Sequence, residues 1–230
     1  MKTPFFSLIL IVILTLSSCN QNKKNQLEYK YSSEAPMVKC DSPDSLLVNE
    51  AIYEFEKNLN AAFNNDGRNT ARIYTTFINQ IIQKRFVVNE FATPHSLEIA
   101  KALNQSSVFK NETFDVNSAV SNCLFNSIKN NNLRTSLNSL KKANSLRDNV
   151  LLPTFQNEAR NFYNDKYIST ILALKYYYPL LVKMEEKDLV EKLDATPQNG
   201  TINFNKTPNT NQTIKPQIKA EQPGHEGHNH

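Results

Sequence analysis

The segment "DSLLVNEAIYEFEKNLNAAFNNDG", residues 44–67, has the apolar spacing of an amphipathic helix. Its large apolar residues recur at intervals of four and three, which places them on one face of a helix. Asp44 or Ser45 can cap the amino end, and the polar run at residues 64–67 ends the pattern. The apolar face consists of Val48, Ile52, Phe55, Leu59 and Ala62.

Helical spacing continues along the chain as far as Asp194. Thr93 is a good cap and Pro94 follows it at a favoured first position, so a short helix should begin there. Pro153 should open a later helix by the same rule. Pro179 must kink or end the last run, because proline removes a backbone hydrogen bond and clashes with the preceding turn. Other apolar runs lie at residues 73–88, 120–128 and 133–140.

Glycine is scarce in this region, where Gly67 is the single example between residues 41 and 194. β-Hairpins, phosphate-binding loops and nucleophile elbows all use glycine for unusual backbone angles or close backbone approach. The runs also show no fixed repeat period, which argues against a regular solenoid. The sequence therefore predicts an all-α domain over residues 41–194, as an irregular bundle or array of about six to seven helices.

The amino end has the pattern of a secretory signal peptide over residues 1–18. Lys2 supplies a positive charge, and the apolar run at residues 5–16 is too short for a membrane-spanning helix of about 20 residues. The run stops where the polar residues 20–26 begin. An uncleaved anchor is the alternative interpretation.

The four residues Leu16-Ser17-Ser18-Cys19 end this apolar run and resemble a bacterial lipobox. The resemblance implies that Cys19 is acylated, that it becomes the first residue of the mature chain, and that its lipid is the contact with the membrane. Stable anchoring needs more than one acyl chain, and such lipoproteins carry two or three. The alternative is an ordinary signal peptide with a chance cysteine.

Asparagine is abundant, as in the run at residues 130–132, and lysine is also frequent. This composition resembles that of lipoproteins from Bacteroidota, which implies an outer-membrane lipoprotein. In that group an acidic cluster after the lipidated cysteine tends to mark export to the cell surface. The matching residues 20–25 read "NQNKKN" and contain no acid, which favours the periplasmic face.

The net charge is mild, at +4 for the whole chain. Removing residues 1–18 removes only Lys2 among the charged residues, which leaves 4 − 1 = +3. This balance predicts no nucleic-acid partner. With Cys19 committed to lipid, Cys40 and Cys123 remain, and an even pair in an oxidising compartment is normally a disulfide. Two unrelated thiols are the alternative.

The two ends of the mature chain are polar. Residues 19–40 predict a flexible lipidated tether, and the proline-rich residues 195–230 predict a disordered tail, since few apolar residues are available to offset the ordering entropy. The tail ends with three imidazoles and a carboxylate, ligands that suit weak binding of zinc or copper; solvated low-complexity sequence is the alternative. No other cofactor is predicted. The ligands would be His225, Glu226, His228 and His230.

Within residues 41–194 few residues suggest chemistry. His95 is the single histidine there and should be exposed or bonded locally at a helix start, while Glu50 and Glu54 should lie on a solvated surface. Tyr176, Tyr177 and Tyr178 point in three directions around a helix, so at least one should reach the surface or a groove near Pro179. These tyrosines could line a ligand groove, or form a mixture of core and rim.

Taken together, these patterns indicate a membrane-anchored envelope lipoprotein that acts as a non-catalytic binding or assembly module with an envelope protein partner. A metal-handling lipoprotein that uses the histidine tail is a second hypothesis. A small envelope enzyme without a recognisable motif is a third.

Overall fold

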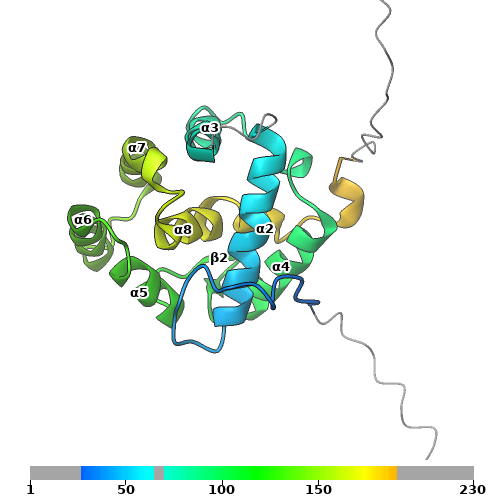
Figure 1. Ribbon diagram of the computed structural model, residues 1–230, viewed down its shortest axis with the longest axis horizontal. Helices are drawn as coiled ribbons and strands as arrows, with labels where there is room; N and C mark the ends of the chain where they lie inside the picture. Colours follow the sequence, from blue (N-terminus) through cyan, green and yellow to red (C-terminus); the bar gives the residue numbers. More distant parts are fainter. Residues whose placement is uncertain (1–26, 65–69, 191–230) are drawn as a thin grey trace, which may run out of the picture. The chain divides into compact units, whose positions relative to one another are not determined.

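The computed structural model describes residues 27–64 and 70–190, and this part of the chain is mainly helical (Figure 1). It contains seven α-helices of eight residues or more, which confirms the predicted all-α fold. The helices are α2 (Ser45–Phe63), α3 (Thr70–Ile82), α4 (Pro94–Gln105), α5 (Ala119–Asn126), α6 (Asn131–Lys142), α7 (Asp148–Glu158), α8 (Lys166–Tyr176) and the four-residue α9 (Tyr178–Leu181), with short 3-10 turns η1 (Val88–Glu90), η2 (Ala159–Asn161) and η3 (Glu186–Asp188).

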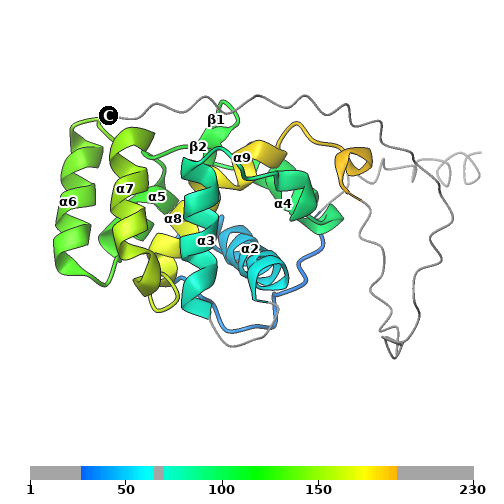
Figure 2. The same ribbon diagram turned by 90° about the horizontal axis from the view of Figure 1, so that it is seen from above.

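The helices pack around α2 and α8, which lie next to each other in the interior (Figure 1). α2 also contacts α3 and α4, while α8 contacts α5 and α9. α3 packs against α7 and η2, and α6 lies at the edge against α5 (Figure 2). The core therefore has two central helices, each covered by several shorter ones.

α8 is the most completely enclosed of the shorter helices. Every residue from Ile168 to Leu174 is buried, as expected of a helix that has neighbours on all sides. Its buried hydroxyls bond to the backbone: Ser169 donates to the Phe162 carbonyl at 2.6 Å and Thr170 to the Lys166 carbonyl at 2.6 Å.

Among the described residues, no helix has both the length and the hydropathy needed to cross a membrane.

Proline has different effects at the three predicted positions. Thr93 caps α4, with Pro94 in its first turn, and Pro179 lies where α8 gives way to α9, so both predictions are confirmed. The predicted start at Pro153 is wrong, because α7 begins at Asp148 and continues through this proline. Leu151 and Phe155 are both buried on the face packed into the core, and Pro153 is exposed, so water can reach the carbonyl that loses its bond.

A two-stranded hairpin lies between α4 and α5, although the scarcity of glycine argued against hairpins in this domain. β1 (Phe109–Lys110) pairs antiparallel with β2 (Thr113–Phe114). The turn contains no glycine; Asn111 and Glu112 take the positive φ angles of 52° and 63° that a tight hairpin requires. Phe109 and Phe114 face each other and are buried, so the core contacts of the two rings stabilise this backbone.

Residues 27–40, which we call the strap, pack against α2 and are not a free tether. Val38 is 1% exposed, and its N–H and carbonyl both bond to the Asn49 side chain, at 3.1 and 2.9 Å. Tyr53 donates to the Ala35 carbonyl at 2.6 Å. This corrects the predicted tether boundary at residue 40. Any tether lies before Leu27, outside the described residues.

A disulfide joins the end of the strap to α5. Cys40 and Cys123 are bonded with their Cα atoms 5.7 Å apart, which confirms the predicted pairing. The bond closes a loop with a sequence separation of 83 residues that contains α2, α3 and α4. Its main effect is to restrict the unfolded chain.

We predict that the double variant Cys40→Ala/Cys123→Ala is less stable than the native chain by up to about 4–5 kcal/mol, because the long loop is no longer closed in the unfolded state. Urea unfolding of both proteins under non-reducing conditions measures the difference. The reduced native chain serves as the control and should unfold at the same urea concentration as the double variant. An unchanged midpoint in the variant would contradict the prediction.

Candidate functional site

A cluster of buried polar side chains lies where the strap and the start of α4 meet α2. Its residues are the acid, base and hydroxyl types that enzymes use. We call it the Glu50–His95 cluster. It contains Glu50, Glu54 and Asn58 of α2, Thr93, His95 and Ser96 at the start of α4, and Tyr31 of the strap.

Glu50 is the centre of the cluster. One carboxylate oxygen is 2.6 Å from His95 Nε2 and accepts the Lys30 N–H at 2.6 Å, while the other accepts the Tyr31 N–H at 3.0 Å. The side chains of Glu50 and His95 are 0% and 2% exposed. The second ring nitrogen, His95 Nδ1, is 3.2 Å from the carboxylate of Glu98 at the surface. Glu50 thus fixes the strap and α4 to α2 at one point.

Glu54 lies one turn further along α2 and accepts from more side chains. Tyr31 donates to it at 2.6 Å and Thr93 at 2.5 Å, with the Ser96 hydroxyl at 3.3 Å. Burial alone would raise the pKa of Glu54. The hydrogen bonds from Thr93 and Tyr31, together with the nearby His95, outweigh burial and hold the pKa below its usual value. Burial raises the pKa of Tyr31, and the hydrogen bond to Glu54 adds to this shift.

The tyrosine run enters this region from the other side. Tyr177 Oη is 3.2 Å from the Ser96 hydroxyl and accepts from the Asn58 amide at 3.2 Å. Burial raises the pKa of Tyr177 to about 12, although its hydrogen-bond contacts with Ser96 and Asn58 oppose this shift. Tyr178 donates to the Ala51 carbonyl of α2 at 2.7 Å.

The prediction that one of these tyrosines reaches the surface or a groove is wrong. Tyr176, Tyr177 and Tyr178 are 8%, 1% and 0% exposed. Three consecutive residues can all be buried here because the junction of α8 and α9 is covered by α2, α4 and α7 on different sides. The run is a packing element that joins these helices.

The geometry of the cluster does not match nucleophilic catalysis. A serine nucleophile needs a hydrogen bond from its hydroxyl to a base. Both ring nitrogens of His95 face glutamates and neither faces Ser96. The Ser96 hydroxyl does donate to the Glu54 carboxylate, but Ser96 is 0% exposed and its hydroxyl is also bonded to Asn58 and Tyr177, so no substrate atom can reach it in this arrangement. The polar groups are matched to one another, which is the arrangement of a buried structural network.

A second buried carboxylate on α2 connects the opposite side of the core. Glu56 accepts from Lys166 Nζ at 2.6 and 2.7 Å and from Tyr74 Oη at 2.5 Å. Burial and the Glu56 charge raise the pKa of Tyr74. α2 therefore holds α3 and α8 through Glu56 as it holds the strap and α4 through Glu50 and Glu54.

The position of the cluster corrects two expectations from the sequence. Glu50 and Glu54 were expected at a solvated surface and are 1% and 2% exposed. His95 does bond locally to Glu98, but it is buried and its shorter contact is with Glu50. The signal available in the sequence was the four-residue spacing of the two glutamates, which puts both on the helix face that α4 covers.

The other predicted site residues lie outside the described residues. Cys19 and the tail residues are among them, so lipidation and weak zinc or copper binding stay predictions. Within the described ranges, no group of three or more histidine, cysteine or acidic side chains is placed to hold a metal ion. The tail residues concerned are His225, Glu226, His228 and His230.

Comparison with known proteins adds no functional information. No protein-family model matches the chain, and neither a curated protein nor a solved structure matches it. The function must therefore be inferred from the sequence signals and from the geometry described above.

We predict that Glu50→Ala destabilises the fold by about 3–5 kcal/mol, because it leaves a buried imidazole and two backbone N–H groups without their acceptor. Glu98→Ala removes the other carboxylate facing His95. It should cost less than about 1 kcal/mol, since the Glu98 side chain is 54% exposed. Urea unfolding followed by circular dichroism compares the two variants. Equal effects would show that Glu50 does not hold the strap.

We also predict that Glu54 makes stability depend on pH in the acid range. Its pKa is lower in the folded chain than in the unfolded chain, so its contribution is complete above about pH 4.3 and is lost as the pH falls through the folded value. Glu54→Gln should therefore lose less stability than the native chain between pH 6 and pH 3 in urea titrations. Glu90→Gln, at an exposed carboxylate, is the control, and a native-like pH profile for Glu54→Gln would contradict the assignment.

Proposed function

We propose that this chain is a lipid-anchored envelope lipoprotein and that it acts as a non-catalytic binding or assembly module. In this proposal residues 1–18 are removed, Cys19 carries the lipid, and the helical domain stands at the periplasmic face of an outer membrane. Its partner would be another protein of the envelope.

The Cys40–Cys123 disulfide is the observation that carries the proposal. Disulfides persist in oxidising compartments such as the periplasm and are rare in the cytosol. This observation comes from the folded domain and is independent of the lipobox-like residues 16–19. Two separate features of the chain thus support export.

The packing of the strap supports a position close to the membrane. Only residues 20–26 separate Cys19 from Leu27, where the described chain begins to pack against the core. Seven extended residues span at most about 25 Å. A domain on so short a connection suits a protein that meets its partner at the membrane surface.

The Glu50–His95 cluster supports a non-catalytic role. Its carboxylates bind the strap amides and the start of α4, and its hydroxyls bond to one another or to Glu54. Because these groups are hydrogen-bonded to one another, they contribute to the architecture of the domain. This favours a protein that binds its partner through its surface.

We predict that Cys19→Ser abolishes acylation and releases the protein from the membrane fraction, because the lipid is the proposed anchor. Mass spectrometry of the native chain should find an acylated amino-terminal peptide that begins at Cys19. Asn20→Ser is the matched control, since it changes the adjacent residue and leaves the lipobox-like residues intact. An unmodified Cys19 in the native mature protein would refute the anchor.

The binding role is tested on the same preparations. Native protein purified from membranes should retain a stoichiometric protein partner, and Cys19→Ser should lose it if the partner is met at the membrane. Recovery of zinc or copper without a protein partner would instead favour the metal-handling hypothesis for the histidine tail.

A further inference from the structure

Residues 116–147 form one edge of the helix array and carry an unbalanced positive charge. This segment contains α5 and α6, which pack against each other, and α6 lies on the outside (Figure 2). It holds five cationic residues and no acid. We call this surface the basic edge. The cations are Lys129, Arg134, Lys141, Lys142 and Arg147.

The remainder of the described chain has the opposite charge. Residues 27–64, 70–115 and 148–190 contain 13 lysines and arginines and 17 aspartates and glutamates, which gives 13 − 17 = −4 with histidine neutral. The basic edge has a charge of +5 on the same count. A domain with its charges separated in this way is oriented by the field of a charged surface.

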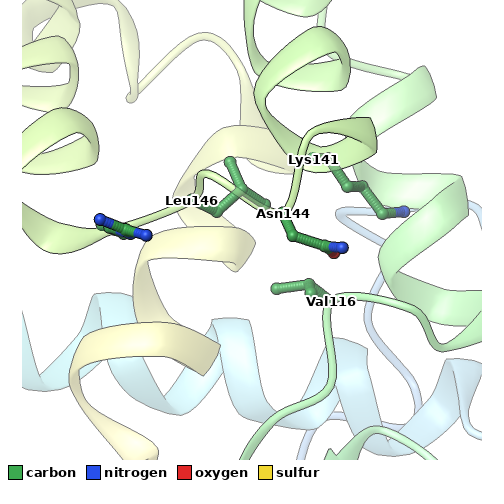
Figure 3. Close-up of a pocket in the computed structure, with 5 residues that line it drawn as sticks. Val116, Lys141, Asn144 and Leu146 are labelled. Atoms are coloured by element: carbon green, nitrogen blue, oxygen red, sulfur yellow. The ribbon is translucent and has the colours of Figure 1, made fainter.

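Neutral groups hold part of the basic edge in place. Arg134 donates to the Ile128 carbonyl at 3.0 Å, and the Lys141 ammonium group donates to the amide oxygen of Asn122 in α5. Figure 3 shows Lys141 near Asn144 at a small pocket by the end of α6. Within the described part of the chain, none of the five cations forms a salt bridge. These contacts position side chains without neutralising their charge.

Three acidic residues border the basic edge. Asp165 is 6% exposed and accepts a backbone N–H at 2.6 Å. Asp148 is 3.3 Å from Lys175 Nζ. Asp115 lies close enough to act electrostatically on Lys141. Counting all three acids with the five cations still leaves 5 − 3 = +2 at this edge.

The basic edge lacks the apolar centre that protein interfaces use. Among the described residues, every large apolar side chain that is exposed lies outside residues 116–147. Protein interfaces depend on apolar and aromatic anchors at their centre, whereas the attraction of cations to anionic headgroups needs none. The composition of the edge therefore fits a lipid surface. The exposed uncharged residues of α6 include Asn131, Asn132, Thr135, Ser136 and Ser139.

We propose that the basic edge docks on the anionic headgroups of a phospholipid bilayer. The inference rests on the proposed function, which holds the domain near a membrane by a short connection. That connection, residues 20–26, contains Lys23 and Lys24 and no acid, so it suits the same surface. In the docked state α5 and α6 face the bilayer, and the acidic remainder of the domain faces away.

Vesicle cosedimentation tests the proposal with residues 19–230 carrying Cys19→Ser, a protein that cannot be acylated and keeps every described residue. It should bind vesicles of phosphatidylethanolamine with phosphatidylglycerol at least about tenfold more tightly than vesicles of phosphatidylcholine alone. Lys142→Gln/Arg147→Gln should weaken binding to the anionic vesicles at least about tenfold, because two attractions to the headgroups are lost. Raising the salt from about 0.01 M to about 0.15 M should also weaken binding, because the Debye length falls from about 30 Å to about 8 Å.

Lys84→Gln/Arg85→Gln is the matched control. Both residues are exposed, lie outside the basic edge and form no salt bridge within the described ranges. This variant loses the same net charge as Lys142→Gln/Arg147→Gln, and its affinity should stay within about threefold of the parent protein, since the attraction falls off within a Debye length.

Three results would overturn the proposal: no binding to the anionic vesicles, equal binding to phosphatidylcholine, or an equal loss in both double variants. If the parent protein ignores vesicles and Lys142→Gln/Arg147→Gln loses a protein partner recovered from membranes, the basic edge is a protein interface instead. Because the tested protein is not acylated, its binding to vesicles and the acylation of Cys19 are separate results. Either one can fail without the other.

Discussion

The buried carboxylate of Glu50 is the interaction on which this arrangement of elements depends. α2 is covered along most of its length, so its buried polar residues cannot be hydrated and must find partners inside the protein. Glu50 meets this requirement with the Lys30 and Tyr31 amides and with His95. A buried pair of this kind adds little net stability compared with apolar packing, but a missing partner is very costly. The strap and α4 are therefore restricted to one position on α2.

Much of the fold could be predicted because its signals are local. The apolar stripe of α2, the Thr93–Pro94 start of α4 and the break at Pro179 each depend on a few neighbouring residues. The disulfide followed from having two cysteines left to pair. The hairpin and the start of α7 were missed because tertiary contacts outweighed local preference. Buried rings stabilise the glycine-free turn, and Pro153 is accepted within a helix at an exposed position.

The Glu50–His95 cluster could not be predicted for a different reason. Periodicity shows which face of a helix is apolar, but it does not show what covers the opposite face. Glu50 and Glu54 have the spacing of surface residues, and the strap and the start of α4 together bury them. The tyrosine run was misjudged in the same way, because helices on several sides of α8 can bury three successive rings.

The strap and its disulfide also determine how the domain responds to a pulling force applied at its amino end. Such tension first loads the hydrogen bonds that Glu50, Glu54 and Asn49 make with the strap, and these share the load. If these hydrogen bonds break, the segment from Leu27 to Cys40, of about 13 residues, can lengthen by no more than about 45 Å. The covalent bond to Cys123 then stops the extension and passes the force to α5, so the loop that contains α2, α3 and α4 is bypassed. The strap is therefore a segment that can lengthen only to a fixed limit. Beyond that limit the disulfide carries the force, and α2, α3 and α4 are not under load.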